Sequence, residues 1–335
     1  MFQQNVSLKP FNTFSLEAKA GHFKAFNSVE ELKEALNHRK GLELLVLGGG
    51  SNILLTKDFN GLVLKNELKG IELVRETEEH YFVEVQAGEN WHQFVLTAIS
   101  NDWAGIENLS LIPGTVGAAP MQNIGAYGVE IEQVFEKLKA VEIATGEVHT
   151  FSHADCQFGY RESVFKKELK GKYIITSVTF RLNKEPVFNT SYGAIKDTLD
   201  EMGIEELSIK AISDAVIQIR QSKLPNPEEI GNAGSFFKNP TVDKIDYEGL
   251  RAEFPGIPGY QQPEQKMKIP AAWLIEQAGW KGKTFGPIGV HKNQPLVLVN
   301  YGGGEGAKIK ELAFEIQQSV ATQFGVELTP EVNII

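Results

Sequence analysis

Arg161 lies in a stretch whose residue types could bind an anion. From Cys156 to Lys166 the sequence alternates aromatic residues with glycine and this arginine. An arginine held by neighbouring rings offers a planar guanidinium, which binds a carboxylate or a phosphate through two parallel hydrogen bonds. The same composition is equally compatible with a surface salt bridge, so the residues alone leave both interpretations open.

A glycine loop from Gly48 to Asn52 is a second candidate anion site. It follows the apolar run Leu42 to Leu47, which predicts a buried strand. A P-loop would require Gly-Lys-Ser or Gly-Lys-Thr, and a dinucleotide fingerprint would require glycine where Ile53 stands, so neither motif fits. Successive backbone N–H groups could instead form an anion nest, with Ser51 and the asparagine as further donors. A plain turn is an equally good interpretation.

The stretch from Leu109 to Glu130 predicts a shaped loop. It contains four glycines, three alanines and two prolines. Glycine permits a positive φ and a close backbone approach, and proline fixes φ and removes a hydrogen-bond donor, so this run can neither fill a core nor form a regular helix. A flexible linker would be polar. The stretch instead keeps apolar side chains such as Leu111, Val116 and Ile124, which favour a pocket wall against a large flat ligand.

Composition limits the possible functions. The 335 residues, 42% apolar and 23% charged, are sufficient for two or three domains. No run approaches the roughly 18 consecutive apolar residues of a membrane span, and Met1 to Pro10 lacks the order of a signal peptide, so we expect a cytoplasmic protein. The single cysteine, Cys156, excludes an internal disulfide, and the scattered histidines predict no metal site. A net charge of −10 argues against nucleic acid or an anionic membrane as partner.

Capping residues and periodicity predict the elements around these stretches. Ser28 and Glu31 stand in capping-box spacing before a short amphipathic helix, and Asn90 caps a helix that leads towards the glycine-rich loop. The run Leu224 to Pro227 ends another helix and indicates a domain boundary. Strands are predicted at residues 81–85, 138–143, 148–152, 173–180 and 296–300, and further helices at residues 212–219, 271–278 and 309–320.

Nine short motifs occur in one order along nearly the whole chain. They are Asn12-Thr13-Phe14, Gly48 to Asn52, Pro113 to Gly128, Phe158 to Lys166, Ser191-Tyr192-Gly193, Lys223-Leu224-Pro225, Gly231 to Pro240, Ile269 to Gly282 and Pro330-Glu331-Val332. Together they resemble the UDP-N-acetylenolpyruvoylglucosamine reductase family, FAD-dependent enzymes that complete UDP-N-acetylmuramate in bacterial peptidoglycan synthesis. The intact tyrosine loop resembles the longer form of the family, in which a tyrosine closes over the substrate.

The resemblance implies an α+β fold in three parts. The FAD-binding region would have the two-subdomain architecture of p-cresol methylhydroxylase and vanillyl-alcohol oxidase. Residues 1–66 with 325–335 would form its first subdomain and residues 67–218 its second. Residues 219–324 would form a C-terminal α+β substrate domain. By the same resemblance, the loop at Gly48 would hold the FAD pyrophosphate, and the loop after Pro113 would lie along the flavin.

The resemblance also implies which residues contact the ligands. The UDP-sugar would contact Tyr192, Lys223, Asn239 and Gln294, and the lysine would supply a cation beside the diphosphate. From the residues alone, a solvated lysine, a loop tyrosine and polar residues before proline explain these four positions equally well. FAD would contact Gly48, Gly49, Gly50, Ser51, Asn52, Pro113, Gly114, Thr115, Gly117, Gln122, Asn123, Gly125, Ala126 and Tyr127.

The family's reaction implies three catalytic residues. NADPH would pass a hydride to flavin N5, and the reduced flavin would pass it to the vinyl carbon of the enolpyruvyl sugar, which leaves negative charge on the adjoining carbon and carboxylate. Arg161 would bind that charge. Glu331 would share a proton with the substrate carboxylate, because a second ionised carboxyl would repel it. Ser235 would protonate the carbon, although its glycine-rich surroundings alone favour a turn-capping serine.

Two other functions stay open at this stage. An FAD oxidase or dehydrogenase of the same fold with another substrate would be expected to lack the pair Ser235 and Glu331. A non-enzymatic nucleotide-sugar binding module would use the glycine loops only to hold phosphates, and the purified protein would be colourless rather than yellow. We expect a monomer that takes NADPH and UDP-N-acetylenolpyruvoylglucosamine, with no nucleic acid and no membrane as partner.

Overall fold

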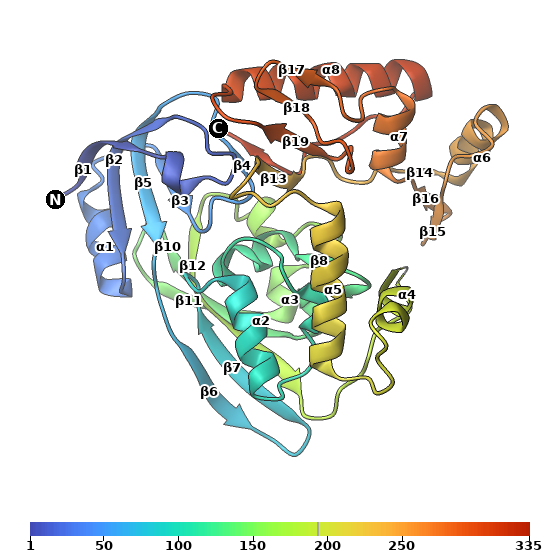
Figure 1. The fold of residues 1–335 in the computed structure, drawn as a ribbon. Coiled ribbons are helices and arrows are strands. Elements are labelled where there is room, and N and C mark those ends of the chain that lie inside the picture. Colours follow the sequence, from blue (N-terminus) through green and yellow to red (C-terminus); the bar gives the residue numbers. More distant parts are fainter. Residues whose placement is uncertain (193) are drawn as a thin grey trace. The chain divides into compact units, whose positions relative to one another are not determined.

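The computed structural model describes residues 1–192 and 194–335, which form two compact units (Figure 1). Unit 1 comprises residues 1–6, 20–49 and 60–222, and unit 2 comprises residues 7–19, 50–59 and 223–335. Gly193, part of the predicted motif Ser191-Tyr192-Gly193, lies outside the described residues. The division into three parts expected from the sequence stays a prediction.

The first sheet of unit 1 has four strands and one helix on a face. Its order is β1 (Gln3–Ser7), β2 (Lys19–Phe26), β5 (Phe59–Asn66) and β3 (Leu44–Leu47). The helix α1 (Val29–His38) buries its leucines in the same cluster as residues of β5. Ser28 caps it, because its hydroxyl oxygen accepts a hydrogen bond from the Glu31 N–H at 3.1 Å. The helix and the strand after it confirm the predictions for residues 28–47.

The second sheet of unit 1 is antiparallel, in the order β11 (Val148–Ser152), β10 (Phe135–Glu142), β12 (Tyr173–Asn183), β7 (His80–Gln86) and β6 (Ile71–Glu76). The helix α2 (Trp91–Ser100) packs into the same core, where the rings of Phe94 and Phe180 lie 5.0 Å apart. Four of these strands and α2 were predicted, and the edge strand β6 was not. Its residues are mostly exposed, so it carries no strong apolar pattern.

The glycine-rich loop is built from short turns. The 3-10 turns Glu107–Leu109, Val116–Ala118 and Pro120–Gln122 precede a small hairpin of β8 (Gly125–Ala126) and β9 (Val129–Glu130). This confirms a shaped loop without a regular helix. The remaining helices of unit 1 are α3 (His153–Cys156), α4 (Ala194–Glu201) and α5 (Ile209–Lys223). The last of these ends directly before Leu224 to Pro227, as predicted.

Unit 2 packs helices against a four-stranded antiparallel sheet. Its order is β13 (Gly231–Ser235), β19 (Val297–Asn300), β18 (Ile288–Val290) and β17 (Thr284–Phe285). The long helix α8 (Gly306–Phe324) lies along this sheet (Figure 1), and α7 (Ala271–Gln277) packs into the same core. A smaller sheet joins β14 (Thr241–Asp243), β16 (Lys266–Lys268) and β15 (Tyr260–Gln262), beside α6 (Lys244–Glu253). The last strand, β20 (Asn333–Ile334), pairs in parallel with β4 (Ile53–Leu54).

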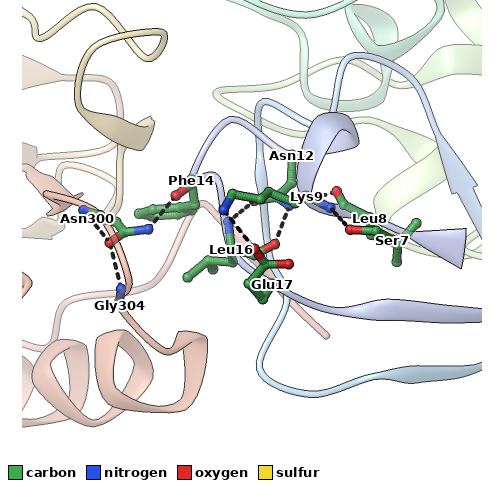
Figure 2. A network of polar contacts seen from close by, with 10 residues as sticks. Ser7, Leu8, Lys9, Asn12, Phe14, Leu16, Glu17, Asn300 and Gly304 are labelled. Atoms are coloured by element: carbon green, nitrogen blue, oxygen red, sulfur yellow. Dashed lines mark hydrogen bonds and ion pairs between the residues drawn. The ribbon is translucent and has the colours of Figure 1, made fainter.

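A loop near the N-terminus belongs to the core of unit 2 (Figure 2). The buried Asn12 side chain bonds to the backbone of Leu8 and Leu16, with distances of 2.9 to 3.0 Å, and shapes the loop. From β19, the Asn300 amide donates to the Phe14 carbonyl at 2.8 Å. Segments far apart in the sequence therefore share one core. None of the helices in the described part of the chain is long and apolar enough to cross a bilayer.

Candidate active site

Two glycine turns of unit 1 meet backbone to backbone. A Cβ atom on Gly49 would lie 2.8 Å from the Gly114 Cα, and one on Gly48 would overlap the Thr115 hydroxyl. Gly49 therefore needs glycine, because its backbone lies directly against that of Gly114, whereas Gly48 lies against the Thr115 side chain. Gly49 is exposed. Bare backbone at the surface can approach a phosphate closely, so the structure favours the anion-nest interpretation over a plain turn.

The start of α2 holds the second of these turns. The Trp91 N–H donates to the Gly114 carbonyl at 3.1 Å, and the Val116 N–H donates to the Glu89 carbonyl at 2.9 Å. Asn90 caps the helix through the Gln93 N–H at 3.0 Å. A capped helix terminus therefore sets the shape of the loop, since the residues on either side of the capping Asn90 bond to the turn.

His92 anchors the beginning of the loop. Its Nδ1 accepts a hydrogen bond from the Leu111 N–H at 3.0 Å, at a residue whose φ of 57° lies in the left-handed region. Burial lowers the pKa of His92, and the nearby charge of Arg220 lowers it further. The ring is therefore held neutral, which is the state in which Nδ1 can accept.

Arg161 is fixed against the glycine-rich loop. Its Nη2 donates to the Gly125 carbonyl at 2.6 Å, and its Nη1 lies 3.4 Å from the Asn123 carbonyl and 3.5 Å from a Glu130 carboxylate oxygen. Its side chain is 19% exposed, and the Tyr160 ring lies 5.2 Å from the guanidinium carbon. The arginine is thus more than a surface salt bridge, because backbone carbonyls of the loop also position it.

Asn123 closes the loop onto the segment that carries the arginine. The asparagine is fully buried and has a φ of 43°. Its amide nitrogen donates to Glu130 at 3.1 Å and to the Gly159 carbonyl at 3.2 Å, while its oxygen accepts from the Glu132 N–H at 3.1 Å. These bonds tie the β8–β9 hairpin to the residues before Arg161, so one network positions the predicted flavin loop and the predicted carboxylate-binding residue.

Tyr192 meets the end of the same loop. Its ring packs edge-on against the Tyr127 ring, with 5.9 Å between centroids, and the residue is 58% exposed. The Tyr127 hydroxyl is hydrogen-bonded to Arg220 of α5, and burial raises the pKa of that phenol. Unit 1 therefore brings together the predicted residues Gly48, Gly49, 113–127, Arg161 and Tyr192.

Unit 2 gathers a second group of predicted residues. The Glu331 N–H donates to the Phe236 carbonyl at 2.8 Å, directly after Ser235, and the Phe236 N–H donates to the Leu296 carbonyl at 2.7 Å. The Asn52 amide donates to the Glu331 carbonyl at 3.3 Å. The serine at the end of β13, the glutamate and the end of the first glycine loop are therefore held on neighbouring segments. Gly50 joins them through the Thr13 N–H, which donates to its carbonyl at 3.1 Å.

The three predicted sugar contacts of unit 2 have different surroundings. Gln294 precedes Leu296 and accepts from the Val297 N–H through its backbone at 3.0 Å, which places it beside the strand that pairs with Ser235. The Asn239 side-chain oxygen accepts from the Ala271 N–H at 2.9 Å and so caps α7. Lys223 is exposed at the end of α5.

Three further residues of the site were not singled out from the sequence. They are Asn108 and Glu130, which bond to the glycine-rich loop or to Arg161, and Arg220, which bonds to Tyr127. Arg220 follows Val216 by four positions and so continues the buried stripe of α5, where a charged residue is unusual. That spacing was the available signal. No pattern marks the other two.

Comparisons with known proteins identify the family. The UDP-N-acetylenolpyruvoylglucosamine reductase of Flavobacterium johnsoniae is 53% identical to this chain over 334 residues, with 99% of each chain covered. The chain belongs to this reductase family. A second member, from Amoebophilus asiaticus, is 55% identical over 335 residues, again with 99% of each covered. The family model for the reductase C-terminal domain matches residues 226–335, and the FAD binding domain model matches residues 22–152.

A solved structure of the family supports the fold. The crystal structure of UDP-N-acetylenolpyruvylglucosamine reductase from Thermus caldophilus matches with a TM-score of 0.70 and 23% identity, over 100% of this chain and 99% of that one. The expected α+β fold with an FAD-binding domain and a C-terminal reductase domain is confirmed. The resemblance drawn from the nine motifs is confirmed by the same comparisons.

Proposed function

We propose that this protein catalyses the NADPH-dependent, FAD-mediated reduction of UDP-N-acetylglucosamine enolpyruvate to UDP-N-acetylmuramate, a step of peptidoglycan synthesis. The observation that carries this proposal is the identity of 53 to 55% to reductases of this name over almost the whole length of both chains. The protein is accordingly an oxidoreductase and a flavoprotein. An FAD oxidase with another substrate and a non-enzymatic binding module lose their support, since neither accounts for that likeness.

The glycine turns fit FAD. The backbone of Gly49 lies so close to that of Gly114 that a Cβ on Gly49 has no room, which leaves the bare amides that a pyrophosphate requires. When bound, FAD supplies the carrier that accepts a hydride from NADPH and delivers it to the enolpyruvyl group. The residues that would hold FAD are Gly48, Gly49, Gly50, Ser51, Asn52, Pro113, Gly114, Thr115, Gly117, Gln122, Asn123, Gly125, Ala126 and Tyr127.

Arg161 binds the carboxylate of the substrate in this proposal. Addition of hydride to the vinyl carbon places negative charge on the adjoining carbon and on the carboxylate. The guanidinium is already held by the Gly125 carbonyl at 2.6 Å, so it needs little reorganisation when that charge develops. An interaction that strengthens as the charge develops lowers the barrier rather than only improving binding.

Ser235 donates the proton that completes the product. Its hydroxyl would give a proton to the carbon that carries the negative charge, and a fixed donor sets the face that receives it. Glu331 lies on the neighbouring segment, since its N–H donates to the carbonyl of Phe236. We assign the glutamate to the shared proton at the substrate carboxylate. Tyr192, Lys223, Asn239 and Gln294 contact the UDP-sugar, with the lysine as the cation beside the diphosphate.

The substitution Ser235→Ala tests these roles. Under anaerobic conditions, NADPH should bleach the flavin of the variant at the rate seen in the native protein, because the serine has no part in that half-reaction. Addition of enolpyruvyl-UDP-N-acetylglucosamine should then fail to restore the yellow colour in stopped-flow measurements. We expect turnover to fall by about 10²-fold or more, the usual contribution of a positioned acid.

Ser319→Ala is the matched control, because this partly buried serine lies on α8 and has no assigned role. It should keep both half-reactions. Retained turnover in the Ser235 variant would remove the serine from the proton transfer, and a native protein that is colourless or inert towards the enolpyruvyl substrate would overturn the proposed function itself.

We also propose that the enzyme works in the cytoplasm, since its composition and charge favour neither a membrane span nor an anionic surface, and that it is a monomer. Light scattering should give a mass close to 37.1 kDa. A mass near twice this value would contradict the monomer, and recovery with the membrane fraction after cell lysis would contradict the location.

A further inference from the structure

A groove opens on unit 2 where the hairpin of β17 and β18 lies beside α8 (Figure 1). Its volume is about 270 Å³. The buried side chains of Ile288 and Leu312 line it together with Phe285 and Pro287, so much of its surface is apolar. Small-molecule sites usually have volumes of about 300–1,000 Å³. The groove is therefore better matched to one or two side chains of another molecule than to a ligand of cofactor size.

The glycine turn between β19 and α8 fixes one end of this groove. The side-chain oxygen of the buried Asn300 accepts hydrogen bonds from the Gly302 N–H at 3.0 Å and from the Gly304 N–H at 2.9 Å (Figure 2). A Cβ on Gly304 would lie 2.6 Å from the Ile288 side chain. The turn therefore places the start of α8 directly beside β18. A groove that is formed in advance loses less conformational entropy when a partner binds.

Exposed carboxylates surround the apolar part of the groove. Glu305, Glu311 and Glu315 all line it. Of the described residues that line the groove, Lys308 alone is cationic, and its ammonium nitrogen lies 2.7 Å from a Glu311 carboxylate oxygen. One cation cannot neutralise three carboxylates, so the groove carries net negative charge.

The combination of apolar floor and acidic rim fits an arginine. The methylene stem of an arginine can lie along apolar surface, and its guanidinium binds a carboxylate through two parallel hydrogen bonds. The Phe285 residue is 45% exposed and offers a ring on which a guanidinium can stack. Among the described residues, no group of three or more His, Cys, Asp or Glu side chains could hold a metal ion, so the glutamates are not arranged as a metal site. A second copy of this chain fits poorly, because its net charge of −10 would oppose association.

We propose that this groove is a docking site for a basic, amphipathic segment of another protein, which places an arginine side chain against Phe285 and the glutamates of the rim. The groove lies at the β17 edge of the four-stranded sheet, whereas Ser235 lies on β13 at the opposite edge. The partner therefore binds away from this predicted catalytic residue. The inference goes beyond the proposed function and does not depend on it.

A labelled peptide of alternating leucine and arginine tests the docking site, with binding to the full-length FAD-loaded protein measured by fluorescence anisotropy. The peptide should bind, and the same peptide with glutamate in place of each arginine should not. Phe285→Ala should weaken binding about fivefold or more, as expected for an aromatic anchor. The double variant Glu305→Gln with Glu315→Gln should weaken binding about threefold, because exposed ion pairs contribute modestly. It should also reduce the salt dependence of binding, since salt screens such charges.

Two matched controls separate the groove from the general acidity of the protein. Phe314→Ala removes an aromatic side chain of α8 that is 52% exposed and does not line the groove. The double variant Glu205→Gln with Glu206→Gln removes the same charge from exposed positions of unit 1. Both controls should bind the peptide with native affinity. Reductase activity should be unchanged in all four variants, since none of the substituted residues has a role in the proposed reaction.

Three results would overturn the docking site. The first is that the arginine peptide does not bind, or binds no better than its glutamate counterpart. The second is an equal loss of affinity in the groove variants and their controls, which would show general attraction to an acidic protein. The third is a mass near twice 37.1 kDa in light scattering that Phe285→Ala returns to a single copy, since the groove would then be an interface between copies of this chain. The binding measurements do not require turnover, so their failure leaves the proposed function intact.

Discussion

At the scale of single residues, the site depends on positions where a side chain is fixed before any ligand arrives. Arg161 is fixed by a carbonyl at 2.6 Å, and Asn123 by three hydrogen bonds from a fully buried position. Both residues also adopt a positive φ, at 56° and 43°. Non-glycine residues in this region cost conformational energy, so the surrounding bonds must stabilise them. The arrangement favours a preorganised site.

Gly49→Ala should prevent tight FAD binding. The new methyl group would lie 2.8 Å from the Gly114 Cα, and backbone cannot move aside as a flexible side chain can. Forced shifts of this kind cost about 1–3 kcal/mol, and if that cost falls on the bound state the FAD affinity should weaken about 5-fold to 150-fold. The ratio of absorbance at 450 nm to that at 280 nm in purified protein, and titration of the apoprotein with FAD, would measure it.

Gly249→Ala is the control for this substitution, because a Cβ at Gly249 meets nothing within 4 Å and the residue lies in α6. It should bind FAD normally. If Gly49→Ala kept the FAD affinity of this control, the glycine turns would not be the pyrophosphate site.

His92→Asn should make the protein less sensitive to acid. The lowered pKa of His92 means that the unfolded chain takes up a proton first as the pH falls below about 6.5, so the free energy of unfolding decreases as the pH drops through that range. Above it the histidine is neutral in both states and contributes no pH dependence. Asparagine places an acceptor where Nδ1 stands and does not titrate, so the Leu111 bond is kept.

The measurement is the melting temperature of the FAD-loaded protein at pH 7.5 and at pH 5.5. Between pH 7.5 and pH 5.5, the melting temperature of the native protein should fall further than that of the variant. The exposed His38 on α1 provides the control His38→Asn, which should lose as much as the native protein. Equal losses in all three proteins would show that His92 does not control acid sensitivity.

The residue types of the site could be predicted from motifs, but their geometry could not. The composition of the surrounding stretches limits the chemical roles open to Gly48, Arg161 and Ser235. Nine motifs in one order then indicate the family. Asn108 has no such context. Its partners lie 19 and 81 positions away, so its role depends on contacts that appear only when the chain is folded.

At the scale of elements, the N-terminus of α2 fixes the conformation of the glycine-rich loop. Glycines leave a loop many conformations, and fixing them costs free energy. The first turn of α2 offsets this cost. Hydrogen bonds to the loop come from the Trp91 N–H and the Glu89 carbonyl, and Asn90 caps the helix between them. The same caps made α1 and α2 predictable from sequence. The edge strand β6 lacks a buried face and was not predicted.

Asn90→Ala should weaken both the helix and FAD binding. Loss of an N-cap costs about 1 kcal/mol, and Asn90 also forms a β-bridge with Thr115 of the loop. If the cost falls on the loop, FAD affinity should decrease about fivefold. Ser28→Ala removes an equivalent cap from α1, whose buried residues belong to a different cluster from those of the loop. Ser28→Ala should lower the melting temperature similarly and leave FAD affinity unchanged. Equal FAD affinity in the two variants would contradict the link between the α2 cap and FAD binding.

At the scale of the whole molecule, the C-terminal part of the chain is completed by residues from near the N-terminus. Phe14, Leu16 and Leu54 belong to the same buried cluster as residues of α7, α8 and β19. Asn300 holds the Phe14 carbonyl and the Gly304 N–H (Figure 2), and the Thr56 N–H bonds to Ile335 at 2.8 Å. Local patterns predict helices and strands. The bonds from Asn300 to Phe14 and from Thr56 to Ile335 join residues almost 300 positions apart, so no local sequence pattern predicts them.

Phe14→Ala should therefore destabilise residues that follow it by more than 200 positions. Phe14 is fully buried, and removing such a side chain costs about 3–5 kcal/mol. Hydrogen exchange measured by mass spectrometry should show faster exchange in peptides from β13, β19 and α8. Phe2→Ala is the matched control, since Phe2 packs against the cluster that contains α1 in unit 1; it should accelerate exchange in α1 and leave β19 unchanged. Local opening exposes only those amides whose core has been weakened. Faster hydrogen exchange in α1 but not in β19 of Phe14→Ala would therefore contradict the assignment of the N-terminal loop to unit 2.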